Sequence, residues 1–396
     1  MDICIILAHF PCRCLYKPSL RIHLKEKVVL RNTQLANNTS VECLVRLWTE
    51  RYVPDLSTLS SEEGRIAVSQ LVEVASPEGR AKTVAKLKRL IQINCECAGI
   101  KTNALFSYIP NVVNLTESGR IAKYVAQVYE KALEIYKEQS ISLASLTTTS
   151  SSFLKTVDFS TNSNVAKEWA LPALEMPAME QLAEMLEPVL LKLREQYISA
   201  RDRRTIGFIT TQFHFSTKLV LGKLTVPEQV LLSPYFKFIE EQVCIPLQRV
   251  CKAAAKHSFN SPTLALVRQL LPASRDIAST VYRQAAKLYP NHHSRRGGLN
   301  NPAIAVSTIR DLEMFQVYLW LCALEGSATV VEQELLPLCM MVFPSVDVTW
   351  ELVEQMLGLL VDELMNRLKP EQKPLLMPYT QAMQQLFSNP EKKFDF

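Results

Sequence analysis

Glycine is scarce in this chain, with 10 residues in 396. A β-sandwich or β-barrel needs many tight turns, and tight turns draw heavily on glycine, so the shortage argues against an all-β fold. Long segments of Leu, Ala, Glu, Gln, Lys and Arg, which favour helix, fill much of the sequence instead. We therefore expect a mostly α, multi-helix protein with a central trihelical helix-turn-helix-like module and a C-terminal helical bundle.

Long apolar runs are also missing. No stretch approaches about 20 apolar residues, the length that a membrane-spanning helix needs. The first residues, Met1 to Leu7, are apolar, but no basic residues precede them, which makes a poor signal peptide. We expect a cytoplasmic protein without a membrane segment. Because residues 1–38 show no clear helical periodicity, a further hypothesis places the natural start near Val28.

Signatures of enzymes and metal sites are absent as well. The sequence has no G-x-S-x-G, no phosphate-binding glycine loop, no H-E-x-x-H and no paired carboxylates. Its 10 cysteines are scattered, and Cys95 and Cys97 are closer in sequence than zinc-ligand pairs usually are. Adjacent His292 and His293 point apart in an extended chain, which favours a solvated or phosphate-facing loop over a metal pair. We expect no enzyme, cofactor or metal.

Composition divides the chain into segments. We expect an irregular tail (1–40), an N-terminal helical domain (41–139), a Ser/Thr-rich linker (140–168), a basic helical domain (169–302) and an acidic C-terminal helical region (303–396). The basic domain would contain a helix-turn-helix-like segment at 242–289 and a basic arm at 290–302. An ordered polar loop is the alternative to the linker.

Charge is distributed unevenly along the C-terminal half. Residues 201–300 hold 15 Lys/Arg against five Asp/Glu, whereas residues 301–396 hold six against 13. Between Arg249 and Arg296 there are nine basic residues and one acid, Asp276, although the whole protein is only +5. Such an excess calls for an anionic partner or counterions. Nucleic acid is the commonest such partner, and we expect double-stranded DNA; a solvated basic face is the alternative.

The basic stretch predicts three short helices. The first would run through Val243 and end near His257. Ser261 followed by Pro262 is a strong start for a second helix at 263–271. The serine oxygen accepts a hydrogen bond from an unpaired backbone N–H of the first turn, and proline has no N–H that would be left unpaired there. The third helix, 275–289, would be capped by Ser274 and is two-faced. Its inner side would carry Ile277, Val281, Ala285 and Leu288, and its outer side Arg275, Ser279, Tyr282 and Ala286, flanked by Arg283 and Lys287.

Two helices joined by a short turn, the second exposing polar and basic side chains, is the helix-turn-helix arrangement. Arginine can grip guanine, so Arg275 or Arg283 would read a base. Serine and tyrosine hydroxyls hydrogen-bond to phosphate oxygens. The segment after the third helix resembles a wing or arm that could lie along a groove or the backbone. The expected DNA-binding residues are Arg249, Lys252, Lys256, Arg275, Ser279, Tyr282, Arg283, Lys287, Arg295 and Arg296.

The segment Pro246–Pro290 (PLQRVCKAAAKHSFNSPTLALVRQLLPASRDIASTVYRQAAKLYP), with the helical segments on either side, resembles the HetZ family of heterocyst-differentiation regulators of filamentous cyanobacteria. The resemblance covers roughly residues 170–390 and rests on no short diagnostic motif. It implies a DNA-binding transcriptional regulator of differentiation that works with a HetR-like master regulator and a PatU-like partner.

Two other functions remain open at the level of sequence. The first is a non-enzymatic helical adaptor or scaffold whose basic face meets an acidic protein, such as the acidic half of another copy. The second is a hydrolase whose site is scattered beyond recognition. For a DNA-binding protein of this type, a symmetric homo-oligomer is the default because paired half-sites benefit from a second recognition helix.

Overall fold

The computed structural model describes residues 44, 51–52, 64–109, 112–138, 179–295, 297–388 and 390 of the chain. The expected tail (1–40), the expected linker (140–168) and Arg296 lie outside these residues. Within them the fold is almost entirely helical, which confirms the mostly α class. None of the helices in these ranges is long and apolar enough to cross a membrane.

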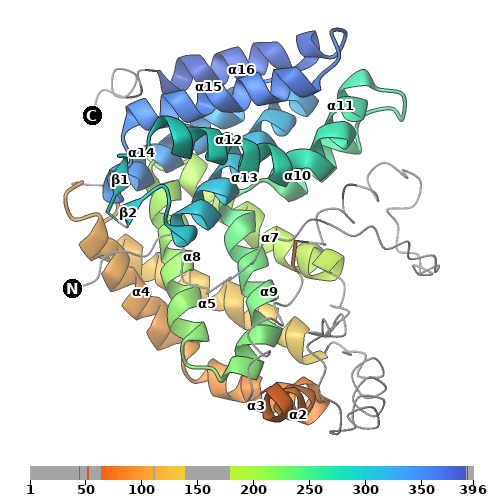
Figure 1. The fold of residues 1–396 in the computed structure, drawn as a ribbon. Coiled ribbons are helices and arrows are strands. Elements are labelled where there is room, and N and C mark those ends of the chain that lie inside the picture. Colours follow the sequence, from red (N-terminus) through yellow and green to blue (C-terminus); the bar gives the residue numbers. More distant parts are fainter. Residues whose placement is uncertain are drawn as a thin grey trace, which may run out of the picture.

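The elements follow one another in a simple order (Figure 1). The first group comprises α2 (Gly64–Ala75), α3 (Pro77–Lys88), α4 (Ile91–Leu105), α5 (Leu115–Glu138), α7 (Met179–Ile198), α8 (Thr205–Leu221) and α9 (Val226–Cys244). The second comprises α10 (Leu247–Ala254), α11 (Pro262–Leu270), the 3-10 turn η2 (Leu271–Ala273), α12 (Ser274–Leu288), β1 (His293–Ser294), β2 (Gly297–Gly298), α13 (Pro302–Glu325), the π-helical turn η3 (Val331–Leu335), α14 (Leu336–Ser345), α15 (Trp350–Arg367) and α16 (Lys373–Phe387).

Helix α8 connects the two groups. It packs against α4 and α9 of the first group and against α14 of the second, and α4 also packs on α5. In the second group α12 lies against α13 and α15, and α16 covers α15 and α13 (Figure 1). The buried apolar side chains of both groups belong to one hydrophobic core. In the C-terminal part, Leu319, Trp320, Leu321 and Leu335 are buried in it, and Trp350 and Leu359 are partly buried against it.

Short sequence signals set several of the helix starts. The Ser261 hydroxyl accepts the backbone N–H of Leu264, and Pro262 takes the first position of α11, as predicted. Asn301 caps α13 in the same way, again with proline in the first turn. These caps fix where α11 and α13 begin, on either side of α12.

Two expectations for this region are wrong. The helix predicted through Val243 to His257 is broken, because α9 ends at Cys244 and α10 begins at Leu247. Proline disfavours helical backbone in the residue before it, and Ile245, which precedes Pro246, is extended. Ser274 does not cap α12 either, since η2 runs straight into α12 and leaves no extended residue in the capping position.

Candidate nucleic-acid interface

Helix α12 has the two faces that the sequence predicts over most of its length. Ile277, Val281 and Ala285 are fully buried against the core, at the expected helical spacing. Leu288 was expected beside them, but it is the last residue of the helix and its side chain is 60% exposed. The buried stripe therefore ends at Ala285, and the last turn of α12 reaches solvent.

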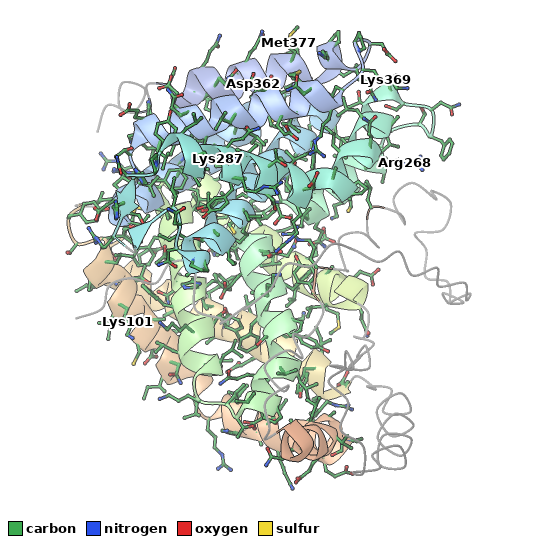
Figure 2. All side chains as sticks on the ribbon, in the orientation of Figure 1. Lys101, Arg268, Lys287, Asp362, Lys369 and Met377 are labelled. Atoms are coloured by element: carbon green, nitrogen blue, oxygen red, sulfur yellow. The ribbon has the colours of Figure 1, made fainter. Side chains whose placement is uncertain are left out.

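The outer face of α12 presents three cations. Arg275, Arg283 and Lys287 are all exposed. Among the described residues Arg283 bonds within its own helix, donating to the Ser279 carbonyl (3.2 Å) and to the Thr280 hydroxyl (3.2 Å). Neither Arg283 nor Lys287 is ion-paired with a carboxylate in the described part of the chain. Lys287 stands on the surface well away from the N-terminal helices (Figure 2).

Tyr282 and Ser279, expected to serve phosphates, make local contacts instead. The Tyr282 ring is half-buried against the core, and its hydroxyl donates to the Leu299 carbonyl. The Ser279 hydroxyl donates to the Arg275 carbonyl at 2.7 Å. Tyr282 thus ties α12 to the chain that follows the β1–β2 hairpin, and its hydroxyl proton is used in that bond.

Arg249 sits in a cluster around a buried carboxylate. Its guanidinium lies 2.8 Å from the Glu334 carboxylate. The same carboxylate accepts hydrogen bonds from the Arg194 guanidinium at 2.7 Å and from the Tyr197 hydroxyl at 3.2 Å. The Glu334 side chain is only 3% exposed, whereas that of Arg249 is 20% exposed. A buried carboxylate is stable only when it is paired and hydrogen-bonded. Arg249 therefore holds α10 onto η3, and its charge is largely compensated within the protein.

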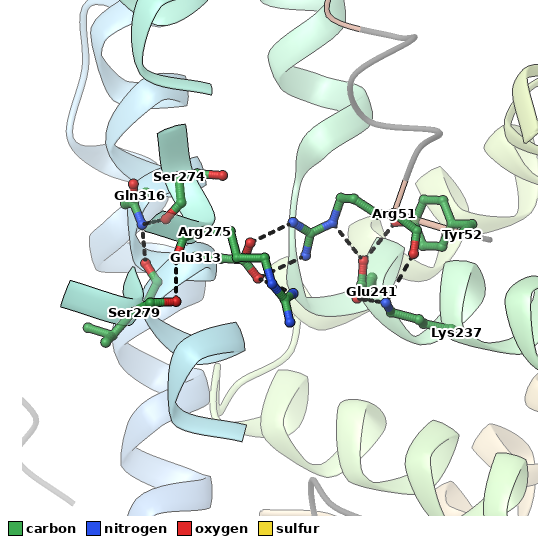
Figure 3. Close-up of polar contacts among 10 residues, drawn as sticks. Arg51, Tyr52, Lys237, Glu241, Ser274, Arg275, Ser279, Glu313 and Gln316 are labelled. Carbon is green, nitrogen blue, oxygen red and sulfur yellow. Dashed lines mark hydrogen bonds and ion pairs between the residues drawn. The ribbon is translucent and has the colours of Figure 1, made fainter. Parts of the chain in front are cut away.

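A second buried acidic cluster lies beside the start of α12 (Figure 3). Arg51 donates to both oxygens of Glu313, at 3.0 and 3.3 Å, and lies 3.5 Å from Glu241. Arg275 approaches Glu313 only to 4.0 Å and keeps 69% of its side chain exposed. Burial would raise the pKa of the Glu241 carboxyl, but the Arg51 guanidinium and the Lys237 ammonium outweigh it and bring that pKa below its ordinary value.

The remaining expected cations differ in their surroundings. Lys252 is exposed and ion-paired with Glu187, and Arg295 is ion-paired with Asp347 at 3.0 and 3.1 Å. Lys256 is exposed and is not ion-paired with any residue of the described ranges. Among the members of the expected set that the structure describes, Lys256, Arg275, Arg283 and Lys287 therefore present the most available positive charge.

The predicted arm is a short antiparallel hairpin. His293 pairs with Gly298 and Ser294 with Gly297, so that Arg295 stands in the connecting turn. Gly297 has φ +119, a backbone conformation that favours glycine. The Arg295 N–H donates to the Val346 carbonyl at 3.1 Å, which anchors the turn to the end of α14. Between α12 and α13 the described part of this segment is not helical, and its turn is tied to the end of α14.

The acids that define the two clusters were missed by the sequence reasoning. Glu313 stands in Leu312-Glu313-Met314-Phe315, and Glu334 is followed by two leucines. A carboxylate inside an apolar helical stretch was the available signal, since such a group is seldom buried unless it is paired. The partners Arg51 and Arg194 lie far away in sequence and carried no signal of their own.

The acidic region thus neutralises part of the basic one. Arg249 is ion-paired with Glu334, and Arg295 with Asp347. In a third ion pair the charges are exchanged: Asp276 of the basic stretch lies 2.7 Å from Arg367 of the acidic region. The charge asymmetry seen in the sequence is partly an internal ionic contact between α10–α12 and α13–α15.

No protein-family model, curated protein or solved structure matches this chain.

Proposed function

We propose that the protein is a cytoplasmic DNA-binding transcriptional regulator that lays the outer face of α12 against duplex DNA. The observation that carries the proposal is the pair Arg283 and Lys287, both exposed and neither ion-paired with a carboxylate of the described residues. Arg249 and Arg295, in the same region, are ion-paired with acidic residues. The charges of Arg283 and Lys287 are therefore available to bind an external anion.

The spacing along α12 suits a phosphate backbone. Arg283 and Lys287 are four residues apart, so they lie one above the other on the same side of the helix. Arg275 is eight residues before Arg283, which is about 12 Å along the axis at the helical rise. That is about three to four base-pair steps of one DNA strand. Arg275 and Arg283 are the candidates for reading a base, and Lys287 for a phosphate.

The hairpin supports the same proposal. It follows α12 immediately, and the Tyr282 hydroxyl bonds the Leu299 carbonyl just beyond it. Helix and hairpin are therefore held in one geometry and can meet a duplex together. A rigid pair of contacts loses less freedom on binding than a loose arm would.

The resemblance to the HetZ family extends the proposal to the control of heterocyst differentiation. On that basis HetR-like and PatU-like regulators are the protein partners to examine. Pull-down with the full chain tests each of them, and the exposed acids of α15 are the first surface to alter.

The DNA proposal is tested by fluorescence anisotropy with promoter fragments across a range of salt concentrations. Arg283→Ala combined with Lys287→Ala is compared with Lys101→Ala combined with Lys123→Ala, which removes the same charge from exposed sites on α4 and α5. We expect the α12 double variant to bind about tenfold more weakly or worse, with a salt slope flatter by about two. Equal loss in both double variants, or no binding by wild type, would overturn the proposal.

One observation favours a second candidate, the adaptor. The basic segment and the acidic region already pair inside one chain, as Arg249 with Glu334 and Arg295 with Asp347 show. The same complementarity could join two copies of the protein. Sedimentation at low and high salt tests this: a salt-sensitive dimer, with DNA binding that is weak and insensitive to Arg283→Ala, would favour the adaptor.

A further inference from the structure

A cavity of about 120 Å³ lies between the hairpin and the C-terminal helices. His292 and Ser294 line it from the hairpin side. The other walls are largely apolar and come from α13, α14 and α15, with Phe315, Phe343, Met356 and Leu357 among them. Four segments of the chain therefore line a partly open pocket of the size of a small organic molecule.

A partly open apolar pocket of this size leaves its lining less well packed than the rest of the interior. Interiors are filled to the density of organic crystals, with few voids larger than a water molecule. Side chains around an empty cavity lose the contacts that a neighbour would supply, so an empty cavity lowers stability. In another protein, an engineered apolar cavity of about 150 Å³ lined by Leu, Ile and Phe stays dry and takes up benzene.

One polar atom in the lining lacks a partner. His292 Nε2 is shielded from solvent and makes no hydrogen bond within the described ranges. Burial, and then the neighbouring His293, lower the pKa of His292, which keeps the ring neutral near pH 7. The carboxylate in the lining, Asp311, is already ion-paired with Arg310 at 2.5 Å. The cavity therefore leaves a hydrogen-bonding group unsatisfied without requiring a charge.

We propose that this cavity binds a small neutral molecule that has a compact aromatic or branched apolar body and one hydroxyl group, which meets His292 Nε2. A hydroxyl both donates and accepts, so it satisfies the ring nitrogen in either tautomer. A charged ligand is disfavoured because its ion would be buried among apolar side chains. This site goes beyond the proposed DNA-binding function and does not depend on it.

Phenol and toluene are the probes, since they share a size and differ in the hydroxyl. Binding is followed on full-length protein with 13C-labelled methionine methyl groups. Met356 lines the cavity, whereas Met341 and Met383 are buried elsewhere and serve as internal references. Met356→Leu identifies the Met356 signal. We expect both probes to shift that signal saturably and to leave the reference signals in place. An unmoved Met356 signal at millimolar probe, or equal shifts at all methionines, would overturn the site.

The polar contact is tested by His292→Phe, with His293→Phe as its matched control. His293 is adjacent and exposed, and it does not line the cavity. We expect His292→Phe to weaken phenol binding about tenfold and to change toluene binding less than about twofold, because only phenol loses a hydrogen bond. We expect His293→Phe to leave both affinities unchanged. Toluene binding without phenol binding in wild type, or equal loss of both probes in His292→Phe, would contradict the proposed ligand class.

A second variant tests the location by filling the space. Leu357→Phe adds volume to a buried wall of the cavity. We expect the variant to keep the helical circular dichroism spectrum and to lose binding of both probes. If Leu357→Phe folds and binds phenol as wild type does, the probe occupies another place and the assignment is wrong.

Discussion

Arg249 and Glu334 join the basic and acidic parts of the chain through a contact of 2.8 Å, although 85 positions separate them in the sequence. The Glu334 carboxylate also accepts hydrogen bonds from the Arg194 guanidinium and from the Tyr197 hydroxyl. The carboxylate is nearly inaccessible to solvent, so its negative charge depends on these three donors. The arginine that begins the basic stretch is thereby a structural residue.

Removing the carboxylate should therefore destabilise the fold. Glu334→Ala leaves Arg194 and Arg249 partly buried without their shared partner, and we expect it to lower the free energy of unfolding by about 3–5 kcal/mol. Glu332→Ala is the matched control, because Glu332 lies in the same π-helical turn and is exposed. Urea denaturation followed by circular dichroism measures both. Equal stability of the two variants would show that the cluster contributes little.

Gly207 marks a close approach between α8 and α14. A Cβ added there would lie 2.4 Å from Met341 Cβ, so Gly207→Ala forces the two helices apart. We expect it to lower the free energy of unfolding by about 1–3 kcal/mol. Gly358→Ala is the control on α15, where an added Cβ meets nothing within 4 Å. Alanine favours helix, so the control should gain about 0.5–1 kcal/mol. Thermal unfolding separates the two, and a stabilised Gly207→Ala would contradict the packing.

Local sequence signals were sufficient for much of the helical fold. The four-residue spacing of Ile277, Val281 and Ala285 predicted the buried side of α12, and Ser261 with Pro262 predicted the start of α11. The same kind of reasoning failed at Ser274, because a capping residue needs an extended backbone that the preceding 3-10 turn does not provide. The packing of α12 between α13 and α15 depends on contacts distant in sequence, which local patterns do not encode. The domain divisions stay predictions.

The candidate interface was predictable only in part. Composition identified the cations, and the periodicity of α12 placed Arg283 and Lys287 on its exposed side. Composition could not show which cations are compensated, because the partners of Arg249 and Arg295 come from the region after residue 302. The bond from Tyr282 to Leu299 was hidden for a related reason, since it depends on how the chain turns back after α12.

The cluster around Glu241 should make the free energy of unfolding depend on pH in the acidic range. Arg51 and Lys237 outweigh the effect of burial and hold the pKa of the Glu241 carboxyl below its ordinary value of 4.5. A carboxyl with a lowered folded-state pKa contributes stability that is complete above its unfolded pKa and is lost as pH falls through the folded value. We therefore expect the free energy of unfolding to fall as pH drops below about 4.5.

Glu241→Gln isolates this contribution. The variant should be less stable than wild type at pH 7, because Arg51 loses one of its two carboxylate partners. The difference should shrink as the pH falls below 4, where the wild-type carboxyl becomes protonated as well. Glu332→Gln, at an exposed position, should follow the wild-type curve throughout. A difference between wild type and Glu241→Gln that is constant from pH 7 to pH 3 would contradict the lowered pKa.

Asp347 offers a gain-of-binding test of the DNA proposal. It is an exposed carboxylate bonded to Arg295 in the turn of the hairpin, and it has φ 57. Asparagine tolerates this left-handed conformation, so Asp347→Asn removes the charge with little change in the backbone. Losing a negative charge beside an interface with phosphates should tighten DNA binding roughly twofold to fivefold at low salt and less at high salt. Glu371→Gln, at the exposed turn before α16, removes one charge elsewhere and should leave the affinity unchanged. If both variants bind DNA as wild type does, the hairpin lies outside the interface.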